Sequence, residues 1–209
     1  MAAPQMTADE VLTTTRSVRR RLDLTRAVAP ALLEDCVRIA LQAPTSVNAQ
    51  TWHFVVVTDD DRRRQLAELY RRAWSDYAGG ASPDDERPDE SPASASARYL
   101  ASILHRVPVH VVPCIEGRPE GMAPGDLAAL YGSIIQAGWS FQLAARSRGL
   151  GSVWTTYHLD YEREAAAALG IPYADVTQVA LIPVAHTIGD EFRLARRRGL
   201  ETVLHWQEW

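Results

Sequence analysis

The sequence predicts an α+β protein rather than a doubly wound parallel one. Segments with helical and extended periodicity follow one another irregularly along the 209 residues, and no internal repeat is visible. Hydrophobic residues make up 46% of the chain, which is ordinary for a globular protein and sufficient for a sizeable core. We therefore expect one domain covering residues 1–209.

Two helices are predicted in the first part of the chain. The first covers Ala8 to Thr15, with Thr7 as its N-cap. The second begins at Pro30 and ends before Pro44. Its apolar residues recur at intervals of three and four: Leu32, Leu33, Cys36, Val37, Ala40 and Leu41. Residues 44–50 must then form an ordered loop.

The next elements alternate between strand and helix. The β-branched and aromatic residues from Trp52 to Thr58 predict a buried strand, and helical spacing returns from Asp60 to Trp74. A short helix from Ala97 to Arg106 precedes a strand from Val107 to Ile115. These segments supply two strands of the expected sheet.

A polar insertion separates two of these elements, at about residues 75–97. It contains paired glycines, three prolines and a run of acids, with almost nothing to bury. The segment is too short for a domain and long for a plain connection. We expect a lid or a surface insertion here.

The second half of the chain begins with its longest helix, from Leu127 to Arg148. A short extended segment is predicted from Val153 to Tyr157, and an alanine-rich helix from Glu162 to Leu169. Val176 to Val184 then reads as the last core strand, because it is continuously apolar or β-branched. Residues 188–209 form a tail.

Two features predict a homodimer. The long helix is apolar almost all round from Leu130 to Ala145, which requires more cover than one small domain easily gives. The tail ends in large apolar residues, whereas free chain ends are normally polar: Val203, Leu204, Trp206 and Trp209. Such a tail would be stable on a partner subunit; the alternative is that it folds back on its own domain.

Composition excludes several classes of protein. A net charge of −4 gives no general attraction to nucleic acid or to an anionic membrane, so we expect neither partner. The apolar runs are too short to span a bilayer. The first ten residues are polar and then acidic, unlike a signal peptide, so a cytoplasmic location is expected.

The common catalytic and metal-binding motifs are also absent from the sequence. It contains no GxSxG, Walker, HExxH or CxxC motif and no dinucleotide-binding glycine pattern. The six histidines never stand at metal-ligand spacing, so we predict no metal site. His110 lies inside an apolar strand and reads as a core histidine. The two cysteines read as packing residues rather than as a disulfide.

Arginine clusters are the remaining candidates for chemistry. All 22 basic residues are arginines. Arg62–Arg64 follow three aspartates and read as a solvated helix face. Arg16 and Arg19 flank Ser17, and Arg196–Arg198 precede the apolar tail. Guanidinium forks with a hydroxyl suit a phosphate monoester. Nucleic acid would also accept such clusters, but they lack interleaved exposed aromatics.

Four blocks of sequence together resemble the FMN-dependent nitroreductase family. They occur in the family's order and cover nearly the whole chain except the insertion. The blocks are Arg16-Ser17-Val18-Arg19, then Ala43 to Trp52 (APTSVNAQTW), then Tyr131-Gly132-Ser133 followed by Gly149 to Thr156 (GLGSVWTT), and finally Arg196-Arg197-Arg198. Each block is short, but the combination in this order is specific.

The resemblance implies an α+β fold with a central mixed, mostly antiparallel sheet flanked by helices, an intertwined dimer and two FMN sites at its interface. Matched position by position, it assigns eleven FMN-binding residues. Arg16, Ser17 and Arg19 would bind the phosphate, the ribityl chain and the pyrimidine edge, with Arg196 and Arg197 completing the phosphate site. Thr45, Ser46 and Asn48 would reach the flavin from the other subunit, and Trp154, Thr155 and Thr156 would line the ring.

The implied activity is transfer of electrons from NAD(P)H, a transient co-substrate, through flavin N5 to a small organic acceptor such as a nitro compound or a quinone. The kinetics would be ping-pong, and no side chain is needed as a general acid or base. Two alternatives stay open: a biosynthetic flavin dehydrogenase or dehalogenase on the same fold, and a non-catalytic flavin-binding protein. The flavin's absorption spectrum and its reduction by nicotinamides discriminate among them.

Overall fold

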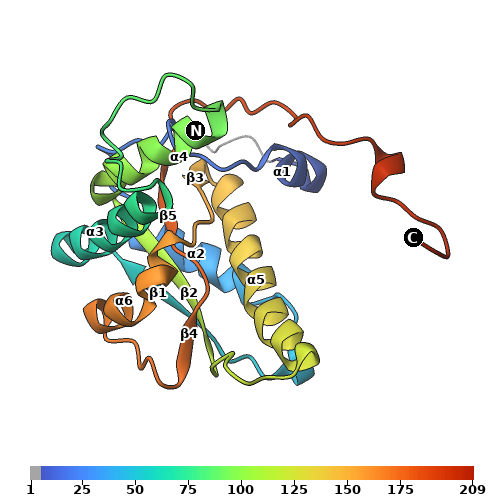
Figure 1. Cartoon of the computed structure of the whole chain (residues 1–209). Helices are drawn as coiled ribbons and strands as arrows, with labels where there is room; N and C mark the ends of the chain where they lie inside the picture. Colours follow the sequence, from blue (N-terminus) through green and yellow to red (C-terminus); the bar gives the residue numbers. More distant parts are fainter. Residues whose placement is uncertain (1–5) are drawn as a thin grey trace.

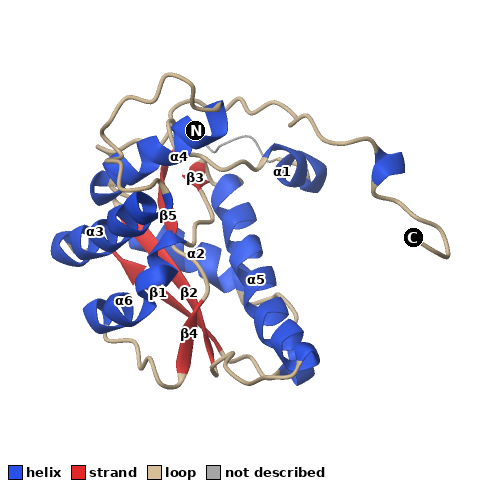
Figure 2. Ribbon diagram, viewed as in Figure 1, coloured by secondary structure: helices blue, strands red, loops and turns tan. Residues whose placement is uncertain are grey.

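The computed structural model describes residues 6–209 and confirms the α+β class, with a five-stranded sheet between two layers of helices (Figures 1 and 2). One layer contains α2 (Pro30–Ala40) and α5 (Pro124–Arg146). The other contains α3 (Asp60–Tyr77), α4 (Pro92–Ile103) and α6 (Glu162–Leu169). A separate short helix, α1 (Ala8–Thr14), precedes both layers.

The sheet has the strand order β1-β2-β5-β3, with β4 paired to the remaining part of β2. The strands are β1 (Trp52–Val57), β2 (Val109–Glu116), β3 (Leu150–Ser152), β4 (Val176–Gln178) and β5 (Ile182–His186). All pairings between these strands are antiparallel. The parallel pairing that the family resemblance implied is represented by an isolated bridge outside these strands, between Ser17 and Ser152.

Alternation along β2 explains how both faces of the sheet are covered. Val109 and Val111 pack with α2 and α5, whereas Val112 and Cys114 pack with α3, α4 and α6. Successive side chains of a strand point to opposite faces, so a continuously apolar strand serves two cores. His110 is fully buried in this strand, as predicted, and its Nε2 lies 3.0 Å from the carbonyl oxygen of Leu104.

Local sequence signals set several helix ends. Thr7 caps α1 in a capping box: its Oγ1 accepts from the backbone N–H of Glu10, while the Glu10 carboxylate accepts from the backbone N–H of Thr7. Helix α6 has the predicted bounds and ends at Gly170, which adopts a left-handed conformation with φ 70°.

The last predicted strand is wrong in its extent. The segment 176–184 is divided into β4 and β5, because Leu181 leaves β2 and exchanges backbone hydrogen bonds of 2.8 and 3.1 Å with Thr155. Thr155 makes this bridge from within the predicted extended segment 153–157. Strand β3 lies just before that segment, where Gly151 pairs with Ala185 of β5.

Strand β1 is less buried than predicted. It pairs only with β2 at one edge of the sheet, and only Val57 among its residues is buried. Its outer edge therefore lies free in the single chain.

The polar insertion is shorter than the sequence predicted. Helix α3 continues to Tyr77, and α4 begins at Pro92 after the N-cap Ser91. The irregular part is tied to both helices. Asp84 pairs with Arg71 of α3 at 2.7 Å, and Glu90 pairs with Arg98 of α4 at 2.9 Å.

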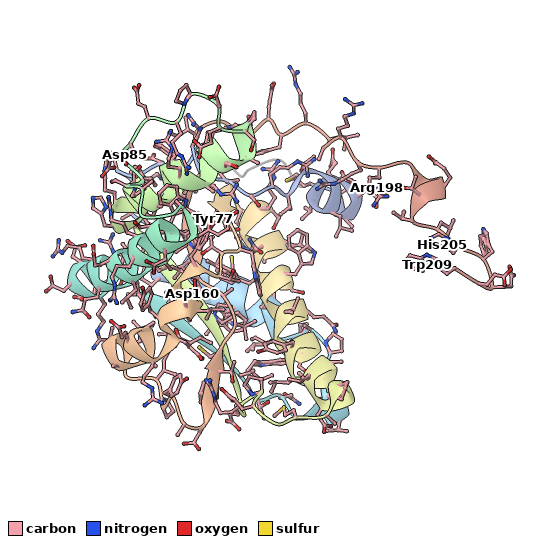
Figure 3. The ribbon with its side chains drawn as sticks, in the orientation of Figure 1. Tyr77, Asp85, Asp160, Arg198, His205 and Trp209 are labelled. Atoms are coloured by element: carbon pink, nitrogen blue, oxygen red, sulfur yellow. The ribbon has the colours of Figure 1, made fainter. Side chains whose placement is uncertain are left out.

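The C-terminal tail leaves the body of the molecule (Figure 1). Residues 196–209 are all exposed, so the alternative in which the tail folds back on its own domain is wrong for this part. Figure 3 places Arg198, His205 and Trp209 far out along it. The rings of His205 and Trp209 stack on each other at 4.7 Å between centroids.

Candidate functional site

Two of the predicted binding blocks lie side by side in the structure. The backbone N–H of Val18 donates to the carbonyl oxygen of Ser152 at 2.9 Å, which aligns the 16–19 segment with β3. Gly151 permits this approach, because a β-carbon on it would lie 2.9 Å from the Val18 side chain and 2.8 Å from that of Thr187. Ser17 stays exposed beside Ser152.

Arg16 contacts backbone rather than other predicted site residues. Its guanidinium donates to the carbonyl oxygens of Thr13 and Thr15, both at 2.8 Å, and to that of Arg193 at 2.7 Å. Arg16 therefore ties the end of α1 to the beginning of the tail.

Two further arginines, which are not among the eleven predicted binding residues, contact the same part of the tail. Arg21 donates to the carbonyl oxygens of Ile188 and Glu191, at 2.8 and 2.7 Å. Arg146 donates to that of Asp190 at 3.2 Å. Their guanidinium groups lie 4.3 and 4.4 Å from the ring centroid of Phe192. An arginine in the last turn of the most apolar helix was the available signal for Arg146.

Arg19 projects toward α4. Its Nη1 donates to the hydroxyl of Ser96 at 3.2 Å, and its buried Nε has no hydrogen-bond partner within residues 6–209. Burial raises the pKa of Tyr157, and the nearby Arg19 charge opposes that rise. Arg19 thus retains donor capacity that the chain itself does not use.

Trp154 lies against the middle of α5. A β-carbon on Gly138 would come within 2.5 Å of the indole, so the absence of a side chain at Gly138 makes room for the ring. Thr155 is buried, and its Oγ1 donates to the carbonyl oxygen of Leu181 at 3.2 Å. Of the predicted trio, Trp154 and the exposed Thr156 remain partly accessible.

The loop with Thr45, Ser46 and Asn48 lies beside the middle of α5, at Ser133. The backbone N–H of Ser46 donates to the hydroxyl of Ser133 at 3.1 Å. Val47, Asn48 and Gln50 have positive φ values of 46, 56 and 53°. Such conformations are costly for a β-branched residue, and Val47 is also 94% exposed.

One chain does not bring the two halves of the predicted site together. Arg146 Nη2 reaches the Thr14 hydroxyl at 3.3 Å, so the 16–19 segment is at the C-terminal end of α5. Arg146 is thirteen residues after Ser133, which corresponds to about 20 Å of helix. Ile135 and Trp139, between these two residues, are 45% and 42% exposed.

Arg196 and Arg197 lie on the exposed tail, and their side chains form no hydrogen bond or ion pair within the described part of the chain. They follow the Arg193 carbonyl that Arg16 holds, and three extended residues span at most about 10 Å. The tail therefore begins beside Arg16, but the structure does not bring Arg16, Arg19 and Arg197 into one cavity of the single chain.

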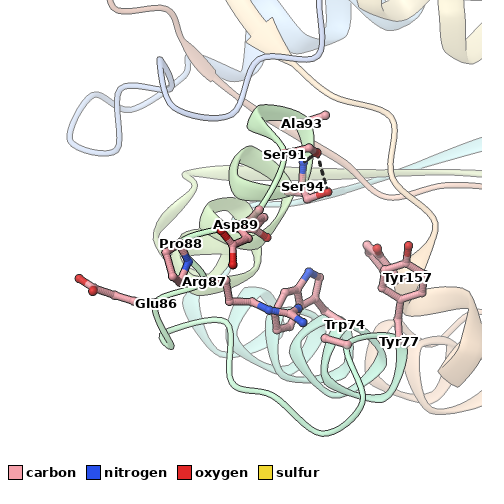
Figure 4. Close-up of a pocket in the computed structure, with 13 residues that line it drawn as sticks. Trp74, Tyr77, Glu86, Arg87, Pro88, Asp89, Ser91, Ala93, Ser94 and Tyr157 are labelled. Atoms are coloured by element: carbon pink, nitrogen blue, oxygen red, sulfur yellow. Dashed lines mark hydrogen bonds between the residues drawn. The ribbon is translucent and has the colours of Figure 1, made fainter.

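A cavity of about 1020 Å³ lies elsewhere in the molecule. It is formed by the end of α3, the irregular segment and the start of α4, with Tyr157 on one side (Figure 4). None of the eleven predicted binding residues lines it, although Arg19 contacts Ser96 of the same α4 helix. The Tyr77 and Tyr157 rings are 5.6 Å apart.

Within residues 6–209, no three histidine, cysteine or carboxylate side chains are grouped to hold a metal ion. No helix in the same range is both long enough and apolar enough to cross a bilayer.

Two proteins with similar sequences match this chain over most of its length. A protein of Archaeoglobus fulgidus, provisionally named an NADH dehydrogenase/NAD(P)H nitroreductase, is 28% identical over 165 residues, which are 78% of this chain and 76% of that protein. The 5,6-dimethylbenzimidazole synthase of Rhodospirillum rubrum is 33% identical over 134 residues, which are 62% of this chain and 59% of the synthase.

Solved structures share the fold. An FMN- and NADPH-dependent nitroreductase from Sphingopyxis sp. strain HMH superimposes with a TM-score of 0.72 at 21% identity, covering 98% of this chain and 100% of that one. Iodotyrosine deiodinase bound to FMN and 3-iodo-L-tyrosine gives 0.72 at 20% identity, covering 96% and 98%.

The sequence model of the nitroreductase family matches residues 12–186. This range includes the 16–19 segment, the 44–50 loop, α5 and β3, whose arrangement is described above. The chain therefore belongs to the nitroreductase family.

Proposed function

We propose that this protein is a cytoplasmic, homodimeric FMN-dependent oxidoreductase that takes electrons from NADH or NADPH and reduces a small organic acceptor, such as a nitro compound or a quinone. Family membership supports the oxidoreductase class. Two structural neighbours of the same fold are named as FMN-dependent or FMN-bound proteins, which supports the choice of flavin.

The observation that carries the proposal is the division of the predicted site between the middle of α5, at Ser133, and its C-terminal end, at Arg146. The loop with Ser46 and the 16–19 segment contact α5 at these two places, about 20 Å apart along the helix, which is too far for both to contact one flavin ring system. In a two-fold dimer with antiparallel α5 helices that cross between these two places, Ser133 of one chain would lie opposite the C-terminal end of its partner's α5. Burial of Ile135 and Trp139 at that contact would stabilise the dimer.

The residues present fit a bound FMN. Ser17 and the backbone beside β3 offer polar groups at an exposed edge, and Arg19 has an unpartnered buried Nε. A guanidinium there would stabilise negative charge at the pyrimidine edge of the flavin. Thr45, Ser46 and Asn48 would come from the partner, and Trp154 and Thr156 would border the ring. Arg196 and Arg197 would hold the phosphate, together with the guanidinium N–H groups of Arg16 that do not donate to backbone carbonyls.

Thr155 has a different role in this proposal. Its hydroxyl is used by Leu181, so it would fix the position of Trp154 and Thr156 through the backbone rather than contact the flavin through its side chain. Bound FMN would supply the electron transfer itself, in two half-reactions on one face. The protein would position both reactants, and no side chain is assigned as a general acid or base.

The test is spectroscopic. The purified full-length chain is expected to be yellow with a flavin absorption spectrum, and anaerobic addition of NADH or NADPH is expected to bleach it. Addition of a nitroaromatic or a quinone should then restore the oxidised spectrum. A colourless protein that does not bind added FMN would overturn the proposal.

A second function on the same fold is supported by one comparison. The identity of 33% to a 5,6-dimethylbenzimidazole synthase supports a dedicated biosynthetic flavin enzyme as the second candidate. In that case the flavin would bind, but neither nicotinamide would reduce it efficiently. Bound flavin without turnover of any acceptor would instead indicate a binding protein.

A further inference from the structure

The cavity beside α4 has an aromatic wall that is partly accessible. Trp74 and Tyr77 come from the last turn of α3, and Tyr157 comes from the segment after Trp154. Trp74 is only 3% exposed, whereas Tyr77 is 78% exposed and packs beside the half-buried Tyr157. Tyr77 and Tyr157 therefore supply the accessible aromatic surface, which suits a flat aromatic ligand in a cavity of about 1020 Å³.

The charged side chains around this wall differ in whether they already have a partner that neutralises them. Glu90 lines the cavity, but its carboxylate is 8% exposed and is neutralised by Arg98 at 2.9 Å. Arg87 forms no side-chain hydrogen bond or ion pair within residues 6–209, and its side chain runs toward Trp74 (Figure 4). Glu86 points away from the cavity in the same view, whereas Asp89 stays near it.

The first turn of α4 adds to the positive character of the cavity. Ser91, Ala93 and Ser94 line it, so the N-terminal end of a twelve-residue helix faces the same space as Arg87. The partial positive charge at a helix N-terminus favours an anionic group. The negative charge of Asp89 opposes the binding of an anion, so its removal should strengthen that binding.

We propose that this cavity binds a small aromatic acid, with the ring against Trp74, Tyr77 and Tyr157 and the anionic group beside Arg87. Because Tyr157 follows Trp154 closely and Arg19 contacts α4 through Ser96, the cavity adjoins the proposed flavin site. That this ligand is also the electron acceptor rests on the proposed function. Its binding to the cavity does not.

The experiment compares ligands of one shape and different charge. Isothermal titration of the purified, oxidised full-length protein would use 4-nitrobenzoate, the neutral 4-nitrobenzamide and the cationic 4-nitrobenzylammonium. A single charge-assisted contact at a partly exposed site should make 4-nitrobenzoate bind about fivefold to tenfold more tightly than the amide. The cation should bind most weakly.

Three variants identify the residues responsible. Arg87→Gln should remove the preference for 4-nitrobenzoate without weakening the amide, and Asp89→Asn should strengthen 4-nitrobenzoate binding. Tyr77→Ala should weaken the anionic and neutral ligands equally. Arg62→Gln is the matched control, because Arg62 is an exposed arginine on the first turn of α3, outside the cavity.

Equal or weaker binding of 4-nitrobenzoate relative to the amide would overturn the inference, as would an anion preference that survives Arg87→Gln. The titration requires neither flavin nor nicotinamide. A colourless protein with an Arg87-dependent preference would therefore reject the proposed function alone. A protein that turns over nitro compounds without that preference would reject only this inference.

Discussion

The indole ring of Trp154 occupies the space where residue 138 would carry a side chain. A β-carbon built on Gly138 lies 2.5 Å from Cζ3 of Trp154 and 3.2 Å from Cη2. Both distances are shorter than ordinary van der Waals contact, so the ring and the helix approach each other closely only because position 138 is glycine. The position of the 153–156 segment relative to α5 depends on this pair.

Gly138→Ala should therefore displace Trp154 and disturb the segment proposed to border the flavin. Overpacking of this kind costs about 1–3 kcal/mol of unfolding free energy. Urea unfolding and the flavin-to-protein ratio would measure both effects. Gly125→Ala is the matched control, since Gly125 belongs to the same helix and a β-carbon on it would meet no neighbouring atom within 4 Å. Unchanged stability and flavin content in Gly138→Ala would contradict this interpretation.

Trp139→Glu should dissociate the proposed dimer. A carboxylate in the centre of a buried α5 contact would be desolvated without a partner, and the subunits should separate at micromolar concentration. Sedimentation velocity would report the mass, and the absorption spectrum should report loss of bound flavin in parallel. Val56→Glu serves as control, because Val56 is 40% exposed, similar to Trp139 at 42%, but lies on β1. A wild-type protein that sediments as a monomer would reject the dimer.

Arg19→Ala should weaken FMN binding or lower the reduction potential of the bound flavin. Loss of one charge-assisted donor corresponds to about a tenfold weaker Kd. Equilibrium dialysis and a dye-coupled redox titration would measure the two quantities without enzyme turnover. Arg20→Ala is the neighbouring control, since that guanidinium lies over the ring of Tyr99 at 5.4 Å. If both quantities match the wild type in Arg19→Ala, Arg19 has no role at the flavin.

Stability should fall as the pH is lowered, because two histidines are buried without charge. Burial lowers the pKa of His110 to about 4 and that of His158 to about 3. Neither ring nitrogen of His158 has a partner within the described residues. Below pH about 6.5 the unfolded chain binds protons that the native chain excludes, so unfolding becomes easier as the pH drops toward 4. Each histidine contributes up to about 1.4 kcal/mol per pH unit in that window.

His158→Gln should remove one of these two contributions. Urea unfolding at several pH values between 7.5 and 4.5 should give a shallower decline of the unfolding free energy than in the wild type. His53→Gln is the control, because His53 is exposed on β1 beside Glu116. An identical slope in His158→Gln and the wild type would assign the acid sensitivity to other groups.

Elements with signals inside their own sequence could be predicted well. Helix α6 has its predicted ends because Gly170 supplies the left-handed residue that terminates it. Helix α1 begins as predicted because Thr7 and Glu10 cap each other. The start of α4 was missed even though Ser91 and Pro92 are ordinary N-terminal residues, because the surrounding acids and prolines indicated an irregular segment.

Features that depend on distant residues could not be predicted. The interruption between β4 and β5 is imposed by Thr155, which is 26 residues from its partner Leu181. Pro113 of β2 lies opposite this interruption and accepts from the backbone N–H of Val179, but as a proline it cannot donate in return. The sequence of residues 176–184 alone reveals neither the bridge to Thr155 nor the proline on the facing strand.

The candidate site was predictable in composition but not in geometry. The family blocks correctly bring the 16–19 segment beside β3. They do not reveal that the Arg16 guanidinium donates to backbone carbonyl oxygens. They also do not reveal that the guanidinium groups of Arg21 and Arg146 pack on the Phe192 ring at the beginning of the tail. Those contacts arise only when the chain ends and α5 are folded together.

The separation of Arg19 and Ser46 along α5 has a genetic consequence under the proposed dimer. Each flavin would need the arginine of one chain and the loop of the other, so a chain defective at Arg19 and a chain defective at Ser46 would fail separately. Mixed together, they would complement: one of the two sites in each heterodimer would receive both intact halves. If equal amounts reassort at random, half of the dimers are heterodimers, so about a quarter of the flavin capacity would return from two inactive preparations.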